Sequence, residues 1–205
     1  MTSNRLFISG IGTDVGKTVA SAILVKAFHA DYWKPVQAGD LENSDCIKVR
    51  NLTGLPEDHF HDESYRLPYP MSPHASAEKA GIEIDISKII VPHHERKLII
   101  EGAGGLMVPI NRKYLYIDLI PQLNAEVILV SRHYLGSINH TLLSIEALDK
   151  RGISIKGILF NGNENQDTES IILERSGIPF LGRISQTAEV NQEFIASESR
   201  KIQFL

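Results

Sequence analysis

The chain has 205 residues, of which 42% are hydrophobic and 22% charged, and its formal net charge at pH 7 is −4. This length suits one domain, expected to span residues 1–205, with a substantial core. The weak negative charge gives no reason to expect nucleic acid or an anionic membrane as a partner. The single cysteine, Cys46, excludes an internal disulfide and a cysteine-based zinc site, and it fits a reducing cytoplasm.

The chain alternates short apolar runs with amphipathic segments. Because no apolar run approaches membrane-spanning length and the first residues lack signal-peptide architecture, we expect a soluble, cytoplasmic protein. In chain order, strands are predicted at residues 5–9, 32–36, 97–101, 126–131, 155–161 and 179–184. Helices are predicted at residues 18–29, 44–52, 86–91, 117–123, 137–151 and 167–176.

This alternation predicts an α/β fold with a doubly wound, mostly parallel sheet, helices on both faces and the character of a P-loop NTPase. In such sheets, ligands bind outside the carboxyl ends of the strands. Residues that carry chemistry should therefore fall just after the predicted strands.

The first such segment follows strand 5–9 and has the pattern of a phosphate-binding loop. Glycines allow a tight turn with N–H groups pointing inward, and the following helix N-terminus favours an anion. A lysine here reaches β/γ-phosphates, and a threonine hydroxyl ligates Mg²⁺. The usual motif has glycine where this chain has Ile11, and an ordinary strand–helix turn is the alternative. The residues of the loop are Thr13, Asp14, Val15, Gly16, Lys17 and Thr18, followed by Val19.

Four further groups lie at or near predicted strand ends. Lys34 could face the γ-phosphate or be a surface lysine. Asp45 could bind a metal or belong to the first turn of a helix. Glu101 closes an apolar strand, where P-loop proteins keep an acidic Mg²⁺ contact, or it belongs to a tight turn. Asn161 and the glycine after it, Gly162, could contact an adenine edge or form a turn.

Histidines in two other segments invite a different interpretation. Residues 59–63 read His-Phe-His-Asp-Glu, which resembles metal-ligand spacing, but no strand or helix pattern supports the segment. We interpret it as a solvated loop. His93 and His94 are interpreted as part of a surface connection.

Taken together, these motifs resemble those of dethiobiotin synthetases over nearly the whole chain. The family joins CO₂ to 7,8-diaminononanoate and closes a cyclic urea, using ATP and Mg²⁺ and releasing ADP and phosphate. The resemblance implies that a substrate carbamate attacks the γ-phosphate of ATP, and that the second amine then expels phosphate. It rests on residues 13–18, 34–36, 43–45, 101–105, 135–140 and Asn161, with support from residues 70–74.

The resemblance also implies a role for each motif. Lys17 and Lys34 are the expected catalytic cations, and Thr18, Asp45 and Glu101 the expected metal ligands. The expected nucleotide contacts are residues 14–19 with Asp45, Glu101, Gly102, Ala103, Gly104, Asn161 and Gly162. The expected substrate contacts are Thr13, Lys34, Ala38, Leu135, Gly136, Ser137, Ile138 and Asn139.

The family's carboxylate seat lies across a homodimer interface, so the resemblance implies a dimer with composite sites. Small molecules, namely the diamine, CO₂ or bicarbonate and ATP, are then the other partners. The chain departs from the family at Ala38, where a hydroxyl is common, and in the late nucleotide loop, residues 184–187. It also lacks an assignable tyrosine after Asn161.

Three other classes of protein share parts of this pattern. A ParA/MinD-like ATPase switch would carry a second lysine early in the loop, but Ile11 and Gly12 stand there. An amide-forming ligase related to cobyric acid synthesis would need a glutamine-hydrolysing domain. A small-molecule kinase that phosphorylates a carboxylate would use the same parts as the synthetase.

Overall fold

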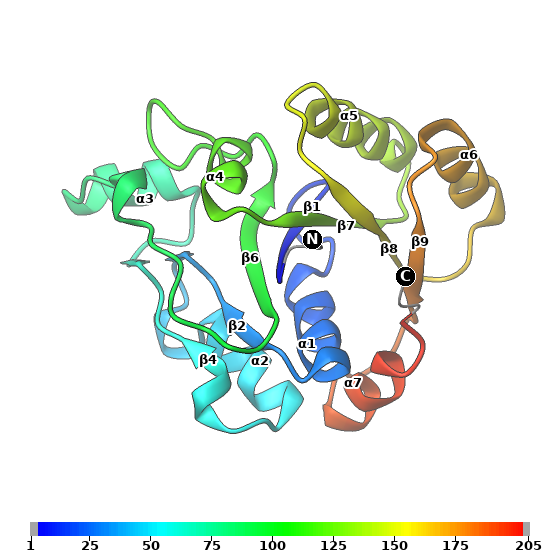
Figure 1. Cartoon of the computed structure of the whole chain (residues 1–205), viewed down its shortest axis with the longest axis horizontal. Helices are drawn as coiled ribbons and strands as arrows, with labels where there is room; N and C mark the ends of the chain where they lie inside the picture. Colours follow the sequence, from blue (N-terminus) through cyan, green and yellow to red (C-terminus); the bar gives the residue numbers. More distant parts are fainter. Residues whose placement is uncertain (1–3, 203–205) are drawn as a thin grey trace.

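The computed structural model describes residues 4–202, and its centre is a seven-stranded sheet whose neighbouring strands all run parallel. The strands lie in the order β4-β2-β6-β1-β7-β8-β9 (Figure 1). This arrangement confirms the predicted doubly wound α/β fold. The strands are β1 (Arg5–Gly10), β2 (Asp31–Trp33), β4 (Phe60–His61), β6 (Leu98–Gly105), β7 (Glu126–Arg132), β8 (Ile155–Asn161) and β9 (Phe180–Ile184).

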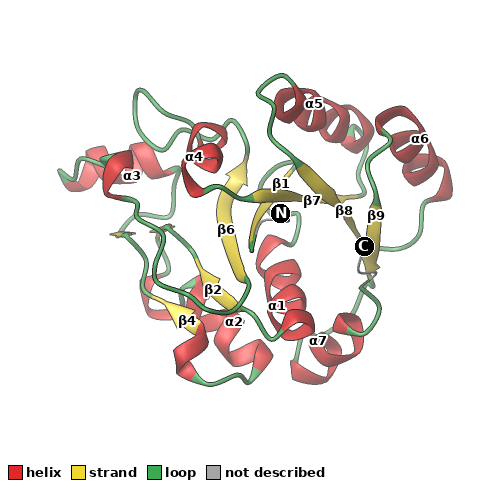
Figure 2. Ribbon diagram, viewed as in Figure 1, coloured by secondary structure: helices red, strands yellow, loops and turns green. Residues whose placement is uncertain are grey.

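Helices cover both faces of the sheet (Figure 2). One face carries α1 (Lys17–Phe28), α2 (Asp45–Thr53) and α7 (Gln192–Ser199), which pack against one another. The other carries α4 (Tyr116–Leu123), α5 (Ser137–Asp149) and α6 (Gln166–Ser176). A two-stranded parallel sheet, β3 (Val36–Ala38) with β5 (Tyr65–Leu67), lies beside α3 (Pro73–Ala80).

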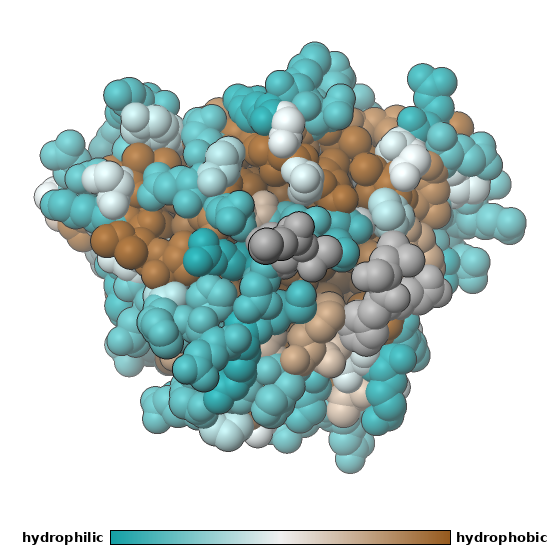
Figure 3. All heavy atoms as spheres, in the orientation of Figure 1, coloured by the Kyte–Doolittle hydropathy of each residue, from teal (hydrophilic) through white to brown (hydrophobic). Residues whose placement is uncertain are grey.

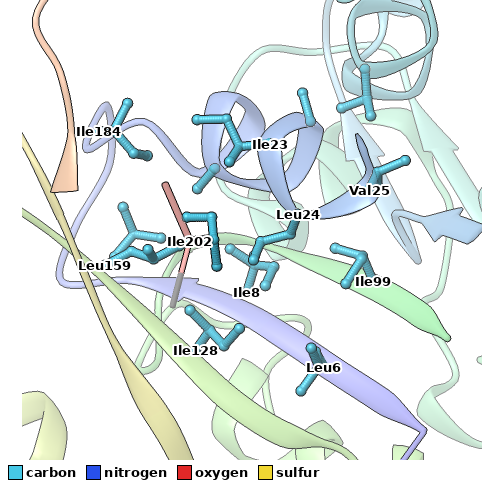
Figure 4. Close-up of a cluster of buried hydrophobic side chains, with 14 of the residues drawn as sticks. Leu6, Ile8, Ile23, Leu24, Val25, Ile99, Ile128, Leu159, Ile184 and Ile202 are labelled. Atoms are coloured by element: carbon cyan, nitrogen blue, oxygen red, sulfur yellow. The ribbon is translucent and has the colours of Figure 1, made fainter. Parts of the chain in front are cut away.

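The central strands are buried on both faces because each sends alternate side chains into two separate cores. Leu6 and Ile8 of β1 pack with α1, together with Ile23 and Leu24 (Figure 4). Phe7, between them, belongs to the core under α4. Burial on both faces therefore fixes the central strands, and with them the carboxyl ends where the predicted site residues lie.

One predicted strand, residues 32–36, is divided in the structure. β2 ends at Trp33, and the chain re-enters a strand at Val36 in the smaller sheet. Pro35 has no N–H to donate to a ladder, so the main sheet ends before it. Lys34 therefore lies just after the last residue of β2, outside the hydrogen-bonded ladder of the main sheet.

Two other expectations were wrong. Residues 59–63 are not a solvated loop: the ring of His59 is 2% exposed and its Nδ1 lies 2.9 Å from the carbonyl oxygen of Ala30. The segment contains the 3₁₀ turn η2 (Glu57–His59) and the edge strand β4, which pairs with β2. The predicted helix at residues 86–91 is only a 3₁₀ turn, η3 (Ile86–Lys88). A third such turn, η1 (Leu41–Asn43), precedes α2.

The surface leaves some large apolar side chains uncovered. Leu135 is fully exposed, and Met107 and Leu143 are about half exposed. On the face drawn in Figure 3, hydrophobic residues gather in the upper half, on the side of the sheet where α4, α5 and α6 lie. Among residues 4–202, no helix combines the length and apolar character needed to cross a bilayer.

Candidate active site

The loop between β1 and α1 has the backbone geometry of an anion site. Asp14 and Gly16 adopt left-handed conformations, with φ of 56° and 93°. A Cβ atom on Gly16 would lie 2.3 Å from the side-chain nitrogen of Asn161 and would have to displace it, and the positive φ also favours glycine. No side chain caps the N-terminus of α1, which leaves its first N–H groups for a ligand.

Lys17 lies at the start of α1 with its ammonium folded back over the loop. The residue is 8% exposed, and its Nζ donates to the carbonyl oxygen of Gly12 at 3.2 Å. Burial lowers the pKa of Lys17, while attraction by Glu101 opposes that shift. Lys17 is therefore a partly desolvated cation that donates its hydrogen bond to a neutral carbonyl.

Lys34 enters the same cavity from the tip of β2 and is 5% exposed. Its ammonium pairs closely with Oδ2 of Asp45 and lies 3.4 Å from Oε1 of Glu101. Burial alone lowers the pKa of Lys34, but the two carboxylates outweigh burial and raise the pKa above its ordinary value. Lys34 is therefore a permanent cation, and the alternative of a surface lysine is wrong.

Asp45 is presented by the first turn of α2. Ser44 is the N-cap, accepting from the N–H of Ile47 at 3.4 Å, so the carboxylate of Asp45 is not used for capping. Burial raises the pKa of Asp45, but Lys34 and Lys48 together outweigh burial, and the pKa lies below its ordinary value. Lys48, one turn later, lies 3.6 Å from the other oxygen of Asp45.

Glu101 is 1% exposed and is held from three directions. The hydroxyl of Thr18 donates to Oε1 at 2.9 Å, and the hydroxyl of Tyr32 donates to Oε2 at 3.0 Å. Lys34 supplies the third contact. Burial and then Glu101 raise the pKa of Tyr32 well above its ordinary value, so it remains a donor. β6 continues to Gly105, so Glu101 lies within a strand rather than at its end.

These groups line one cavity of about 760 Å³ at the carboxyl edge of the sheet. Thr13, Val19 and Ala38 also line this cavity, and so do Ala103 and Gly104. Gly102 instead faces the core, since a Cβ there would lie 2.8 Å from the ring of Phe7. The cavity is also lined by four residues that were not predicted from the sequence as site residues: Gln37, Asp40, Lys48 and Val108.

The segment 70–74 approaches the cavity from α3. Pro70 through Pro73 line the cavity wall, and Gly39 packs so tightly on Pro70 that a Cβ would lie 2.5 Å from its Cα. The side-chain amide of Gln37 connects Gly39 with the start of α2. Its nitrogen donates to the carbonyl oxygen of Gly39, and its oxygen accepts from the N–H of Asp45 at 3.3 Å. The packing of Gly39 on Pro70 joins two separate segments of the chain, so it leaves no local signal in the sequence.

A second cavity, of about 560 Å³, is lined at the ends of β7, β8 and β9. Asn161 and Gly162 line it, but the side-chain nitrogen of Asn161 donates to the carbonyl oxygen of Val15 at 2.8 Å. The second N–H of that amide and the side-chain oxygen are left for another partner. The predicted late loop, residues 184–187, lines the same cavity.

The segment 135–139 stands apart from both cavities. Gly136 is the N-cap of α5 with φ of 104°, and no side chain caps the helix. Leu135 beside it is fully exposed. None of these five residues lines the cavity that contains Lys17 and Lys34.

The donor set fits a magnesium ion bound together with a nucleotide. Among residues 4–202, no group of three or more His, Cys, Asp or Glu side chains is arranged to hold a metal. Mg²⁺ in nucleotide sites takes only one or two carboxylates, with phosphates and water completing the shell. Asp45 and Glu101 already share a cation, the ammonium of Lys34, and Thr18 adds a hydroxyl.

A strand, a left-handed turn and an uncapped helix beginning at Gly-Lys-Thr define the class: a P-loop nucleotide-binding protein. The sequence model described as "AAA domain" matches residues 4–193. Among solved structures, a ParA family ATPase from Chlorobium tepidum superposes with a TM-score of 0.57 at 14% identity, covering 96% of this chain and 91% of that one. The Pyrococcus furiosus cell division ATPase MinD gives 0.55 at 14%, with 97% and 98% coverage. These similarities show the fold.

Sequence relatives define the family within this class. The ATP-dependent dethiobiotin synthetase BioD of Christiangramia forsetii is 52% identical over 95% of this chain and 94% of that protein. The corresponding protein of Cytophaga hutchinsonii is 47% identical over 97% and 96%. The chain belongs to the ATP-dependent dethiobiotin synthetase family, as the sequence motifs indicated.

Proposed function

We propose that this chain is a dethiobiotin synthetase that carboxylates 7,8-diaminononanoate with CO₂ and closes the ring at the expense of ATP. The observation that carries the proposal is the convergence of Lys17 and Lys34 on one cavity that also holds Asp45, Glu101 and the hydroxyl of Thr18. Family membership supplies the identity of the substrates. The expected place of action is the cytoplasm.

The two lysines answer the main electrostatic difficulty of this reaction. A carbamate that attacks a triphosphate brings one anion against another, and preorganised cations stabilise the charge that develops. Lys17 and the N–H groups of residues 14–18 hold the β- and γ-phosphates. Lys34 bridges the carbamate and the transferred phosphoryl group after moving off Asp45. The carbamate oxygen forms the new bond to phosphorus, and ADP leaves.

Ring closure uses the same cations. The second amine attacks the carbonyl carbon of the mixed anhydride, the bond to the phosphate oxygen breaks, and the amine proton leaves with solvent or phosphate. Asp45, Glu101 and Thr18 would hold Mg²⁺, which neutralises phosphate charge when it is bound. The rigid support of Glu101 by Tyr32 keeps that carboxylate in one orientation.

A second subunit completes the site in this proposal. The uncapped N-terminus of α5 suits a carboxylate, and it lies outside the cavity of its own chain. Exposed Leu135, Met107 and Leu143 give this region apolar surface for a twofold contact. The substrate carboxylate would then be bound by residues 135–139 of the partner subunit. The second cavity, with Asn161 and the loop 184–187, would hold the nucleotide base.

The test is an omission assay with ATP, Mg²⁺, bicarbonate and diaminononanoate, in which both ADP and dethiobiotin are measured. We expect ADP release to require the diamine, with one dethiobiotin formed for each ADP. A Lys34→Ala variant should retain nucleotide binding and lose about a hundredfold in turnover, the size expected for one charge-stabilising donor. Equal ATP turnover without the diamine would refute the proposal in favour of a switch ATPase or another kinase.

A further inference from the structure

Arg132 is the last residue of β7, and it contacts the backbone of the phosphate loop. Its Nη1 donates to the carbonyl oxygen of Asp14 at 3.1 Å, across 118 positions of sequence. The residue is exposed and lines the second cavity, whereas Asp14 lines the first. The contact therefore lies at the junction between the two cavities.

Arg132 and Asn161 hold two consecutive carbonyls of this loop. Arg132 takes the carbonyl oxygen of Asp14, and Asn161 takes the carbonyl oxygen of Val15. In a trans peptide, the C=O and the following N–H point in opposite directions, and no described peptide bond is cis. Both donors come from strand tips outside the loop, so the N–H groups of Val15 and Gly16 point the other way.

The backbone at Asp14 is the part of the loop that most needs such support. Its φ of 56° places a residue other than glycine in the left-handed region, which is sparsely populated. A hydrogen bond from a guanidinium is stronger than one from a neutral donor, so Arg132 is suited to stabilise this peptide.

We infer that Arg132 is a positioning residue for nucleotide binding, because it sets the Asp14–Val15 peptide so that the loop presents its N–H groups to phosphate. This inference rests on the proposed binding of ATP at residues 14–18. Lys17 and Lys34 remain the groups that act on the reacting atoms, so Arg132 affects affinity for the nucleotide rather than the chemical step.

The experiment compares Arg132→Met, which keeps the length but removes the donor, with Arg132→Lys, which restores a donor. A matched control is Arg175→Met, the same change at an exposed arginine in the last turn of α6. ADP affinity is measured by calorimetry without diamine, so a failure to form dethiobiotin leaves this test intact. The melting temperature without nucleotide is recorded for every variant.

Arg132→Met should weaken ADP binding about tenfold, equivalent to about 1.4 kcal/mol. The KM for ATP should rise by the same factor, while kcat stays within about twofold and the KM for the diamine is unchanged. Arg132→Lys should recover most of the affinity, and Arg175→Met should resemble the wild type. ADP affinity within twofold of wild type for Arg132→Met overturns the inference. So does an equal loss in Arg132→Lys, or a melting temperature without nucleotide that falls for Arg132→Met and not for Arg175→Met.

Discussion

Replacing Lys34 by methionine tests the electrostatics of the site independently of catalysis. The change keeps most of the side-chain volume and removes the charge, so it leaves Asp45 and Glu101 without the cation that now lies between them. Removing one partner of a buried ion pair costs about 3–5 kcal/mol of stability. Because the side chain of Asp45 is 19% exposed, we expect about 3 kcal/mol. For a chain of this length that corresponds to a fall in melting temperature of about 10 °C.

The loss of unfolding free energy in Lys34→Met should be larger at high pH than at low pH. In the wild type, the pKa of Asp45 is lowered, so its ion pairing stabilises the fold at neutral pH and is lost as pH falls below about 4. In the variant, Asp45 keeps its partial burial and its neighbour Glu101 but loses Lys34, the main group that lowers its pKa, so its pKa rises. The variant then takes up a proton on folding, and its deficit should shrink as pH is lowered from 8 to 5.

Magnesium ion supplies a third arm of the same experiment. If the ammonium of Lys34 occupies the cation position between Asp45 and Glu101, Mg²⁺ without nucleotide should stabilise Lys34→Met more than the wild type. A ligand at 100 times its Kd adds about 2.7 kcal/mol, enough to restore most of the loss. Lys17→Met is the matched control, because Lys17 contacts a carbonyl and not a carboxylate. We expect about 1 kcal/mol for it.

The assay is thermal unfolding of the three proteins at pH 5, 6.5 and 8, with and without millimolar Mg²⁺. A Lys34→Met melting temperature within 2 °C of wild type at pH 8 would refute the reasoning. A deficit that does not change with pH, or an equal loss in Lys17→Met, would do the same.

Two further predictions concern the loop and the cysteine. Gly16→Ala should lower ADP affinity at least tenfold, because the new Cβ displaces the Asn161 amide. The control is Gly177→Ala, where φ is also positive but no atom lies within 4 Å of the new Cβ, so only the backbone penalty applies. Equal losses of ADP affinity in the two variants, measured by calorimetry, would contradict this prediction. Burial, then Glu63, raise the pKa of Cys46 to about 11, so iodoacetamide at pH 8 should modify it on the order of a hundredfold more slowly than free cysteine. Modification at the rate seen in urea would show that the thiol is accessible and ionised.

Much of the site could be predicted because its parts carry local signals. The Gly-Lys-Thr opening of α1 follows from rules on turns and helix termini that act within a few residues. Lys34 was expected near the end of a predicted strand, and the structure shows that the strand stops just before it because Pro35 cannot donate to the ladder. The parallel sheet followed from apolar runs with no polar alternation.

The missed features depend on contacts between distant segments. β4 has two residues, and it exists because Phe60 and His61 pair with β2. His59 is buried against the ring of His29, at 4.5 Å between centroids, and against the Ala30 carbonyl. A polar sequence such as His-Phe-His-Asp-Glu gives no local sign of that partner. The predicted helix at residues 86–91 failed for a related reason: it has apolar residues at its ends but too few turns to form without tertiary support.

The ion pairs of Lys34 with Asp45 and Glu101 stabilise the fold, and the proposed reaction requires Lys34 to leave them. Before nucleotide binds, its ammonium is neutralised by Asp45 and Glu101, the same carboxylates expected to hold Mg²⁺. Mg²⁺ arriving with ATP would take over those carboxylates and leave Lys34 buried with a charge that needs a new anion. The carbamate and the γ-phosphate are the anions at hand. The exchange of partners would therefore direct a desolvated cation to the reacting atoms only when metal, nucleotide and substrate are all present, and this is the physical reason for predicting that ATP turnover requires the diamine.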